Sequence, residues 1–284
     1  MRRIAFAALF LVLAACSKDK EVNPPAELVD FRQTLAVERA WDASVGGGDA
    51  ALRLGLGATV VGDRVYAAGH GGEIAAFALA NGRALWQTKT KAPLAGSTGA
   101  DATLVVAGSS EGEVIALSGE SGSVLWRVRV RGEVLSAPLV APTAVVVRTV
   151  DGRLVALARE DGHELWSVEQ QIPRLTLRGV AAPVLAGDVV LCGFDNGKVV
   201  GASLRDGSVL WETAVAPPRG RTELERLSDI DSRVLVSGDN VFAVGFQGRI
   251  AMLALDTGQI WWSRDLSSYR GLALDGDHLY ISTA

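Results

Sequence analysis

The side chain with the clearest chemistry lies near the start of the chain. Arg2 and Arg3 precede a twelve-residue apolar run that ends at Ala15, directly before Cys16. A bilayer span takes about 20 apolar residues, so this run has the length of a secretory signal and not of a membrane helix. Leu13-Ala14-Ala15-Cys16 matches a lipobox, the motif at which cleavage leaves an acylated Cys as the new N-terminus. We therefore expect Cys16 to carry the lipid, including palmitate; the alternative is an ordinary secretory signal in which Cys16 is incidental.

Few other residues are candidates for catalysis. Cys192 lies in an apolar stretch and has no partner thiol once Cys16 is acylated, so we interpret it as a small buried apolar residue. The three histidines, His70, His163 and His278, fall in or near turns of different repeats and have no metal-ligand spacing. The many glycines fall at hairpin positions and form no phosphate-cradling loop. We expect no catalytic residue, no metal site and no cofactor, and hence no enzymatic activity.

The composition is that of a folded, slightly acidic protein. The 284 residues carry a formal net charge of −4, and 49% of them are hydrophobic, which excludes a disordered chain. No basic stripe is present, so nucleic acid is not an expected partner. The segment Ser17 to Pro25 is polar and ends in two prolines, as in a solvated tether. We expect a signal peptide over 1–15, a lipidated tether over 16–25 and one folded domain over 26–284.

A tandem repeat organises that domain. The pattern Gly-x-x-x-Trp occurs five times, with steps of 40, 40, 45 and 51 residues between successive tryptophans: Trp86, Trp126, Trp166, Trp211 and Trp262. Each copy follows a short strand-like phrase and an apolar, often Val-rich run, and Asp-Gly or Asn-Gly hairpin signals punctuate the period. Such units of three or four strands are typical of β-propeller blades. We predict an all-β propeller.

The tryptophans are predicted to pack between blades. A substrate-stacking residue would not need to recur in every blade, so we favour a structural role over a binding role. Trp41 has the character of a blade's last strand without the preceding ones, which suits an N-terminal strand that completes the final blade of a ring. Five full periods follow, and Leu272 to Ala284 begin a sixth. The apolar edge that this would leave exposed suggests a C-terminally truncated chain.

Two connections between blades depart from the repeat, and we expect function there. Residues 170–179 contain Leu175, Leu177 and Arg178, and residues 216–231 contain the acids Asp229 and Asp231. The second connection also holds Leu224, Leu227, Arg219 and Arg221, and Thr222 with Glu225 predicts a capping box for one helical turn. Exposed Leu beside Arg, rimmed by acids, is typical of a protein-docking patch. The alternative is that Arg178 pairs with Asp229 or Asp231 only to brace the loops.

The repeats resemble those of quinoprotein-type propellers, and the whole sequence resembles the BamB family of lipoproteins. The lipobox, the tether, the phrase Ile172 to Gly179 and the phrase Pro218 to Asp231 carry this resemblance. It implies an eight-bladed, non-catalytic propeller that is anchored by lipid at the periplasmic face of the outer membrane of a Gram-negative bacterium. It also implies binding to the POTRA domains of BamA within the barrel assembly complex, and unfolded barrel precursors are a further expected partner.

The resemblance assigns partner contacts to five residues. A Leu-x-Leu-Arg phrase of the family falls on Leu175, Leu177 and Arg178, and the acids of the neighbouring connection fall on Asp229 and Asp231. About two blades of the family fold are missing from the sequence. Two other functions stay open from the residues alone: a quinone-dependent dehydrogenase, and a propeller that senses a small periplasmic ligand through its central channel.

Overall fold

Antiparallel sheets of short strands make up the folded part of the chain. The computed structural model describes residues 30, 32–47, 54–177 and 179–283. The chain divides into two units, Met1–Glu38 and Arg39–Ala284, and every strand of the described residues lies in the second unit. The described residues form five four-stranded sheets and one two-stranded sheet. No helix long and apolar enough to cross a bilayer occurs among them.

The sheets, here called blades 1 to 5, follow the sequence in order. Blade 1 comprises β1 (Thr59–Val61), β2 (Arg64–Ala68), β3 (Glu73–Ala78) and β4 (Ala84–Lys89). Blade 2 comprises β5 (Gly99–Ala100), β6 (Leu104–Gly108), β7 (Glu113–Ser118) and β8 (Val124–Arg129). Blade 3 comprises β9 (Leu139–Val140), β10 (Ala144–Arg148), β11 (Arg153–Ala158) and β12 (Glu164–Glu169).

Two further blades and a hairpin complete the described chain. Blade 4 comprises β13 (Val184–Ala186), β14 (Val189–Gly193), β15 (Lys198–Ser203) and β16 (Val209–Ala214). Blade 5 comprises β17 (Leu235–Ser237), β18 (Asn240–Val244), β19 (Arg249–Ala254) and β20 (Ile260–Asp265). The last sheet pairs β21 (Leu272–Leu274) with β22 (Leu279–Ile281).

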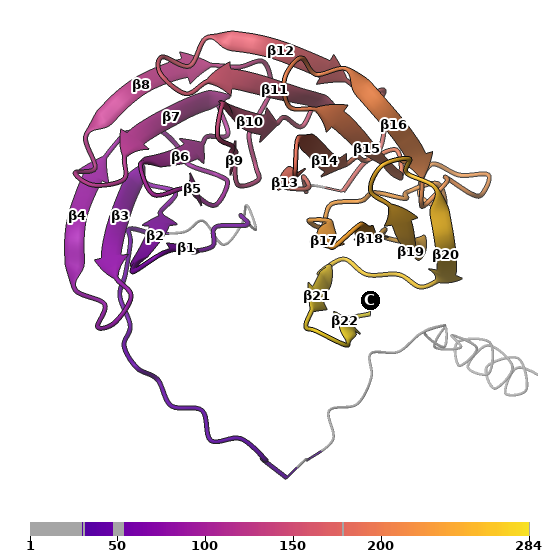
Figure 1. Ribbon diagram of the computed structural model, residues 1–284, viewed down its shortest axis with the longest axis horizontal. Coiled ribbons are helices and arrows are strands. Elements are labelled where there is room, and N and C mark those ends of the chain that lie inside the picture. Colours follow the sequence, from indigo (N-terminus) through magenta and orange to yellow (C-terminus); the bar gives the residue numbers. More distant parts are fainter. Residues whose placement is uncertain (1–29, 31, 48–53, 178, 284) are drawn as a thin grey trace, which may run out of the picture. The chain divides into compact units, whose positions relative to one another are not determined.

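Each blade is a simple antiparallel meander, in which every strand pairs with the next one in the sequence. Within residues 39–284 the blades follow one another along an arc, with the first strand of each blade innermost and the last outermost (Figure 1). In each blade a register shift interrupts the pairing of the third and fourth strands next to the tryptophan. The predicted all-β propeller of quinoprotein-type blades is confirmed.

The core lies between neighbouring blades. The two middle strands of blades 2, 3 and 4 are almost wholly buried, because β-branched and small apolar residues occupy both of their faces. One cluster joins Val146 and Leu154 of blade 3 to Val190 and Val200 of blade 4. Since each such cluster draws on two sheets, a blade is stabilised mainly by the blades beside it.

The tryptophans form a repeated joint between blades. The ring of Trp166 packs on Gly207 of the next blade, where an added Cβ would lie 2.7 Å from ring carbons, and φ at this glycine is +73°. Its indole N–H donates to the carbonyl of Leu204 at 2.9 Å. The same donor bond recurs from Trp86 to Gly119, from Trp126 to Arg159 and from Trp211 to Leu255.

Trp41 makes the same joint with blade 1. Its indole N–H donates to the carbonyl of Leu79 at 2.8 Å, and its ring lies against Gly82 and Phe77. The residues around Trp41 do not form a strand in the structure, unlike the expectation, because no neighbouring strand in the described chain supplies a hydrogen-bonding partner there. The side chain nevertheless takes the position that the preceding blade's tryptophan takes elsewhere.

Candidate functional site

The first irregular connection, residues 170–183, leads from β12 to β13. It is held at its start by the bond from the Gln170 amide to the carbonyl of Gly152 and by a bond from the Asn196 side chain to the carbonyl of Gln171 at 3.1 Å. Further along, the Leu177 amide donates to the carboxylate of Asp229 at 2.5 Å. The connection therefore rests on hairpins of blades 3 and 4 and on the second irregular connection.

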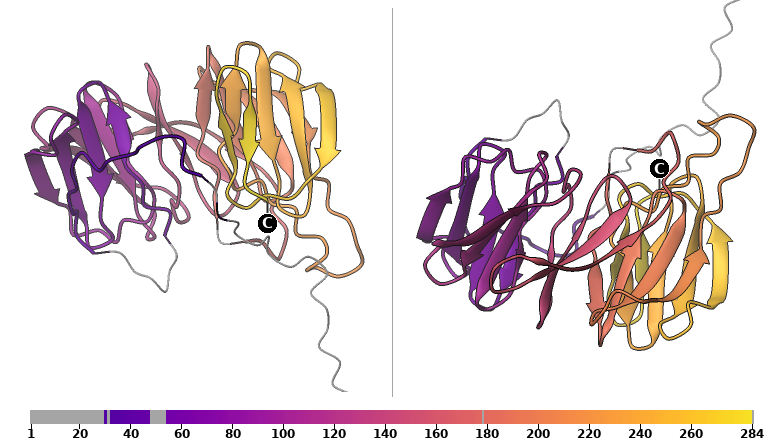
Figure 2. Two further views of the ribbon diagram at one scale, coloured as in Figure 1. Left: turned by 90° about the horizontal axis from the view of Figure 1, so that it is seen from below. Right: turned by 90° about the horizontal axis from the view of Figure 1, so that it is seen from above.

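The second connection, residues 215–234, leads from β16 to β17 and projects beyond the ends of the strands (Figure 2). The predicted capping box is confirmed: the Glu225 amide donates to Thr222 Oγ1, and the Glu225 carboxylate accepts from the amides of Thr222 and Arg221. Leu224, at the tip, is exposed. Leu227, which was expected at the surface, is buried, because the segment after the turn runs back into the propeller.

Asp229 and Asp231 lie beneath the connections and not on an outer rim. Asp229 is only 1% exposed, and its backbone carbonyl accepts from Phe246 N while the Ile230 amide donates to the carbonyl of Phe194. Asp231 is half-buried, and its carboxylate lies so close to Gly179 that an added Cβ there would meet Oδ2 at 2.7 Å. The two acids thus contact the buried side of the first connection.

Burial controls the ionisation of these acids. Desolvation raises the pKa of Asp229 to about 6, against the opposing effect of the Leu177 amide that it accepts. Desolvation and the neighbouring charges of Asp195 and Asp229 raise the pKa of Asp231 to about 8. At neutral pH Asp231 therefore keeps its proton in most molecules, whereas Asp229 is largely ionised and accepts the Leu177 amide as a carboxylate.

A buried ion pair that the sequence analysis missed lies beside these acids. Arg148, which is fully buried, contacts Asp195 at 3.3 Å and stacks over the ring of Phe194 at 4.4 Å. Burial raises the pKa of Asp195, and the Arg148 charge opposes that rise. One signal was available: Arg148 ends the second strand of its blade, where the other blades have Ala68, Gly108, Gly193 and Val244.

The two leucines of the first connection face different hollows. Leu175 is 43% exposed and lines a groove of about 440 Å³ between the two connections. Leu177 is half-buried and lines a smaller hollow of about 220 Å³ together with Asp195 and Gly179. Arg178 and Cys16 lie outside the described residues. The structure therefore joins Leu177 to Asp229 and places Asp231 against Gly179, while Leu175 faces the groove between the two connections.

The remaining candidates for chemistry are separate from this site. Burial raises the pKa of the Cys192 thiol to about 12, so this thiol is an inert core group. His70 binds the carbonyl of Leu94, His163 pairs with Asp161, and His278 lies beside Asp275. Across the described ranges, no group of three or more His, Cys, Asp or Glu side chains could hold a metal ion.

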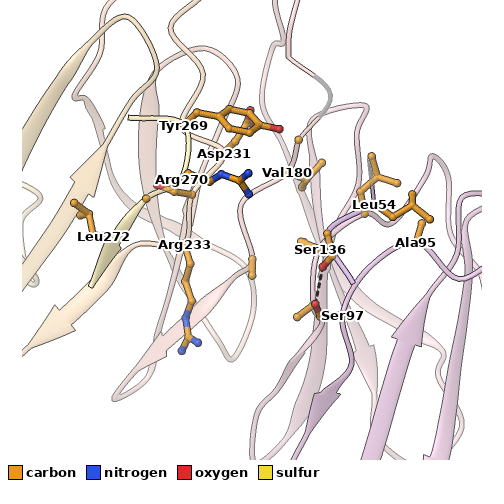
Figure 3. Close-up of a pocket in the computed structure, with 17 residues that line it drawn as sticks. Leu54, Ala95, Ser97, Ser136, Val180, Asp231, Arg233, Tyr269, Arg270 and Leu272 are labelled. Carbon is orange, nitrogen blue, oxygen red and sulfur yellow. Dashed lines mark hydrogen bonds between the residues drawn. The ribbon is translucent and has the colours of Figure 1, made fainter. Parts of the chain in front are cut away.

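The central hollow, of about 380 Å³, is where a quinone-type propeller would hold a cofactor. Arg233 and Arg270 lie on one wall, and Leu54 and Ser97 lie on the opposite wall (Figure 3). Asp231 is the single carboxylate among the residues that line it. A calcium ion beside a quinone requires several oxygen ligands, so the residues described here do not fit that cofactor.

Comparisons with known proteins agree with this geometry. The family model described as "Outer membrane protein assembly factor BamB" matches residues 33–98 and 71–284. The chain is 47% identical over 284 residues to the protein of that name from Pseudomonas aeruginosa, covering 100% of this chain and 75% of the relative. It is 52% identical over 277 residues to the one from Marinobacter adhaerens, covering 98% and 71%.

Solved structures show the same fold. The crystal structure of BamB from Moraxella catarrhalis has a TM-score of 0.74 and 26% identity, and the match covers 78% of this chain and 68% of that one. A quinohemoprotein alcohol dehydrogenase from Pseudomonas putida has a TM-score of 0.57 and 15% identity, with 73% and 41% covered, so its likeness concerns the fold alone. On the family model and these relatives, the chain belongs to the BamB family of outer membrane protein assembly factors.

Proposed function

We propose that this BamB family member is a non-enzymatic scaffold that binds the periplasmic POTRA domains of BamA through its two irregular connections and so assists the insertion of outer-membrane β-barrels. Its role as an outer-membrane assembly factor follows from its family. The contact residues would be Leu175, Leu177 and Arg178. Asp229 and Asp231 would act from below by fixing the backbone of the loop that presents them.

The observation that carries this proposal is that Leu175 is exposed in a loop whose backbone is held in place. An apolar side chain in an irregular loop gains nothing from exposure, yet Leu175 is 43% exposed and lines a groove, while Asp229 holds the loop two residues further on through the Leu177 amide. Pinning lowers the entropy that the loop would lose on binding, and an apolar anchor at the centre of an interface typically contributes most of the affinity.

Leu175→Asp tests the site. Replacing an interface anchor with a charge should weaken binding to purified POTRA domains by about 2 kcal/mol or more, roughly thirtyfold. Leu125→Asp is the matched control, because Leu125 is a 53% exposed leucine on β8, away from the connections. Titration of both variants, with melting curves to verify folding, measures the effect. Equal affinity of Leu175→Asp and the wild type would contradict the site.

The scaffold would be anchored through Cys16, at the periplasmic face of the outer membrane. The support is the lipobox and the polar tether that follows it, both outside the described residues. Metabolic labelling with palmitate should mark the wild type and leave Cys16→Ala unlabelled. Equal labelling of the two proteins would place the acyl chain elsewhere.

A further inference from the structure

The groove beside Leu175 has a chemistry of its own. Its walls come from both connections and from the start of β15. Ile172, Pro173 and Pro218 supply apolar surface along it. Prolines and a β-branched residue lose little conformational entropy when a partner covers them, so this surface is suited to receiving an apolar side chain.

Cationic side chains dominate the same groove, which we call the basic groove. Arg174, Arg221, Arg226 and Lys198 line it, against one acid, Glu223. Lys198 is paired with Glu212 at 2.7 Å. The three arginines are exposed and make no ion pair within the described ranges of the chain.

This local charge contrasts with the rest of the molecule. The chain as a whole carries a net charge of −4, so a cluster of unpaired arginines is a local feature of the two connections. A further acid of the second connection, Glu225, does not line the groove and is occupied in the capping box, where its carboxylate accepts two amides. The acids Asp229 and Asp231 lie below and are not positioned to neutralise the arginines.

We infer that the basic groove receives a short acidic segment of the partner protein, with an apolar side chain seated between Leu175 and Pro218 and carboxylates facing Arg221 and Arg226. Guanidinium groups bind carboxylates through paired hydrogen bonds, which orients such a segment as well as attracting it. This inference rests on the proposed function, since the segment belongs to the protein that the connections bind.

An anionic lipid surface would use the same charges, but the geometry favours a protein segment. The arginines surround a walled groove of about 440 Å³ with an apolar lining, whereas binding to a lipid surface needs cations spread over an open face. The chain's overall negative charge also opposes adhesion to an anionic membrane.

The test compares Arg221→Glu/Arg226→Glu with Arg83→Glu/Arg205→Glu in a full chain that carries Cys16→Ala, so that no acyl chain contributes. Arg83 and Arg205 are exposed in the turns after β3 and β15, away from the basic groove, and the two double variants have the same net charge. Association with purified POTRA domains is measured at several salt concentrations, and binding to phosphatidylglycerol vesicles is measured in parallel.

We expect Arg221→Glu/Arg226→Glu to associate with the POTRA domains about tenfold more slowly than the control at low salt, with the difference shrinking as salt rises. Equal rates and equal salt dependence for the two variants, with the wild type still bound, would overturn the basic groove and leave the proposed function standing. A wild type that does not bind would overturn the proposed function and this inference with it. Vesicle binding that is lost only in Arg221→Glu/Arg226→Glu would overturn the protein segment in favour of lipid.

Discussion

The contacts that join neighbouring blades and the contact that joins the two irregular connections differ in their chemistry. At each blade joint a tryptophan ring packs on a glycine in a hairpin of the next blade, as at Trp166 and Gly207. The indole N–H donates one hydrogen bond to a carbonyl of the same hairpin. The joint between the connections is a buried carboxylate, Asp229, that accepts the Leu177 amide. The first kind is apolar and does not titrate. The second depends on a group whose charge changes within the range of ordinary buffers.

The rigid blades and the connections that we propose to bind the partner are thus held in place by different interactions. The tryptophan contacts at a fixed repeat contain no titratable group, so their contribution to stability does not depend on ionisation. Carboxyl groups with raised pKa values hold a loop in place at a cost, because ionised carboxylates are poorly tolerated in the interior. Asp229 and Asp231 impose that cost at a connection that departs from the repeat, which is where we place the partner contacts.

The largest expected effect is on the stability of the blades. Trp166→Ala removes a side chain that is 8% exposed and should lower the free energy of unfolding by about 3–5 kcal/mol. Trp261→Ala is the control, because Trp261 is 58% exposed on β20, and it should cost far less. Denaturant unfolding at neutral pH measures both. Similar losses for the two variants would show that the buried tryptophans are not what joins the blades.

A second effect on stability is expected from pH. The raised pKa values of Asp229, about 6, and of Asp231, about 8, mean that the folded state keeps protons which the unfolded chain releases near pH 3.8. Stability should therefore fall as pH rises from about 5 to 8, since the slope follows the difference in bound protons. Asp229→Asn/Asp231→Asn should flatten this fall, and an Asn oxygen can still accept the Leu177 amide.

The comparison with the double variant isolates these two groups from the histidines. Unfolding free energies of both proteins are measured across that pH range, and the difference between the two curves is the quantity of interest. Asp161→Asn is a suitable control, because hydrogen bonds with His163 lower the pKa of this exposed acid. A pH profile that is unchanged in the double variant would show that neither acid titrates as its burial implies.

The repeat could be predicted from the sequence because each of its parts has a local cause. Hairpin glycines, β-branched strands and one tryptophan per period are short-range signals, and the capping box of Thr222 and Glu225 is another. The burial of Leu227 and Asp229 could not be predicted, because an irregular loop has no period that says which side chains face inward. The Arg148 pair with Asp195 joins two blades, and such contacts leave no local pattern except a residue out of place in its strand.

The contact at each tryptophan determines how far the effect of a backbone cleavage would spread. The ring belongs to one sheet, but the glycine and carbonyl that receive it belong to the last hairpin of the following sheet. A nick in that hairpin would therefore loosen the sheet before it as well as its own. Cooperativity in this propeller is shared across blade boundaries, and Trp41, which docks on blade 1 from outside any described strand, extends this interlocking beyond the sheets themselves.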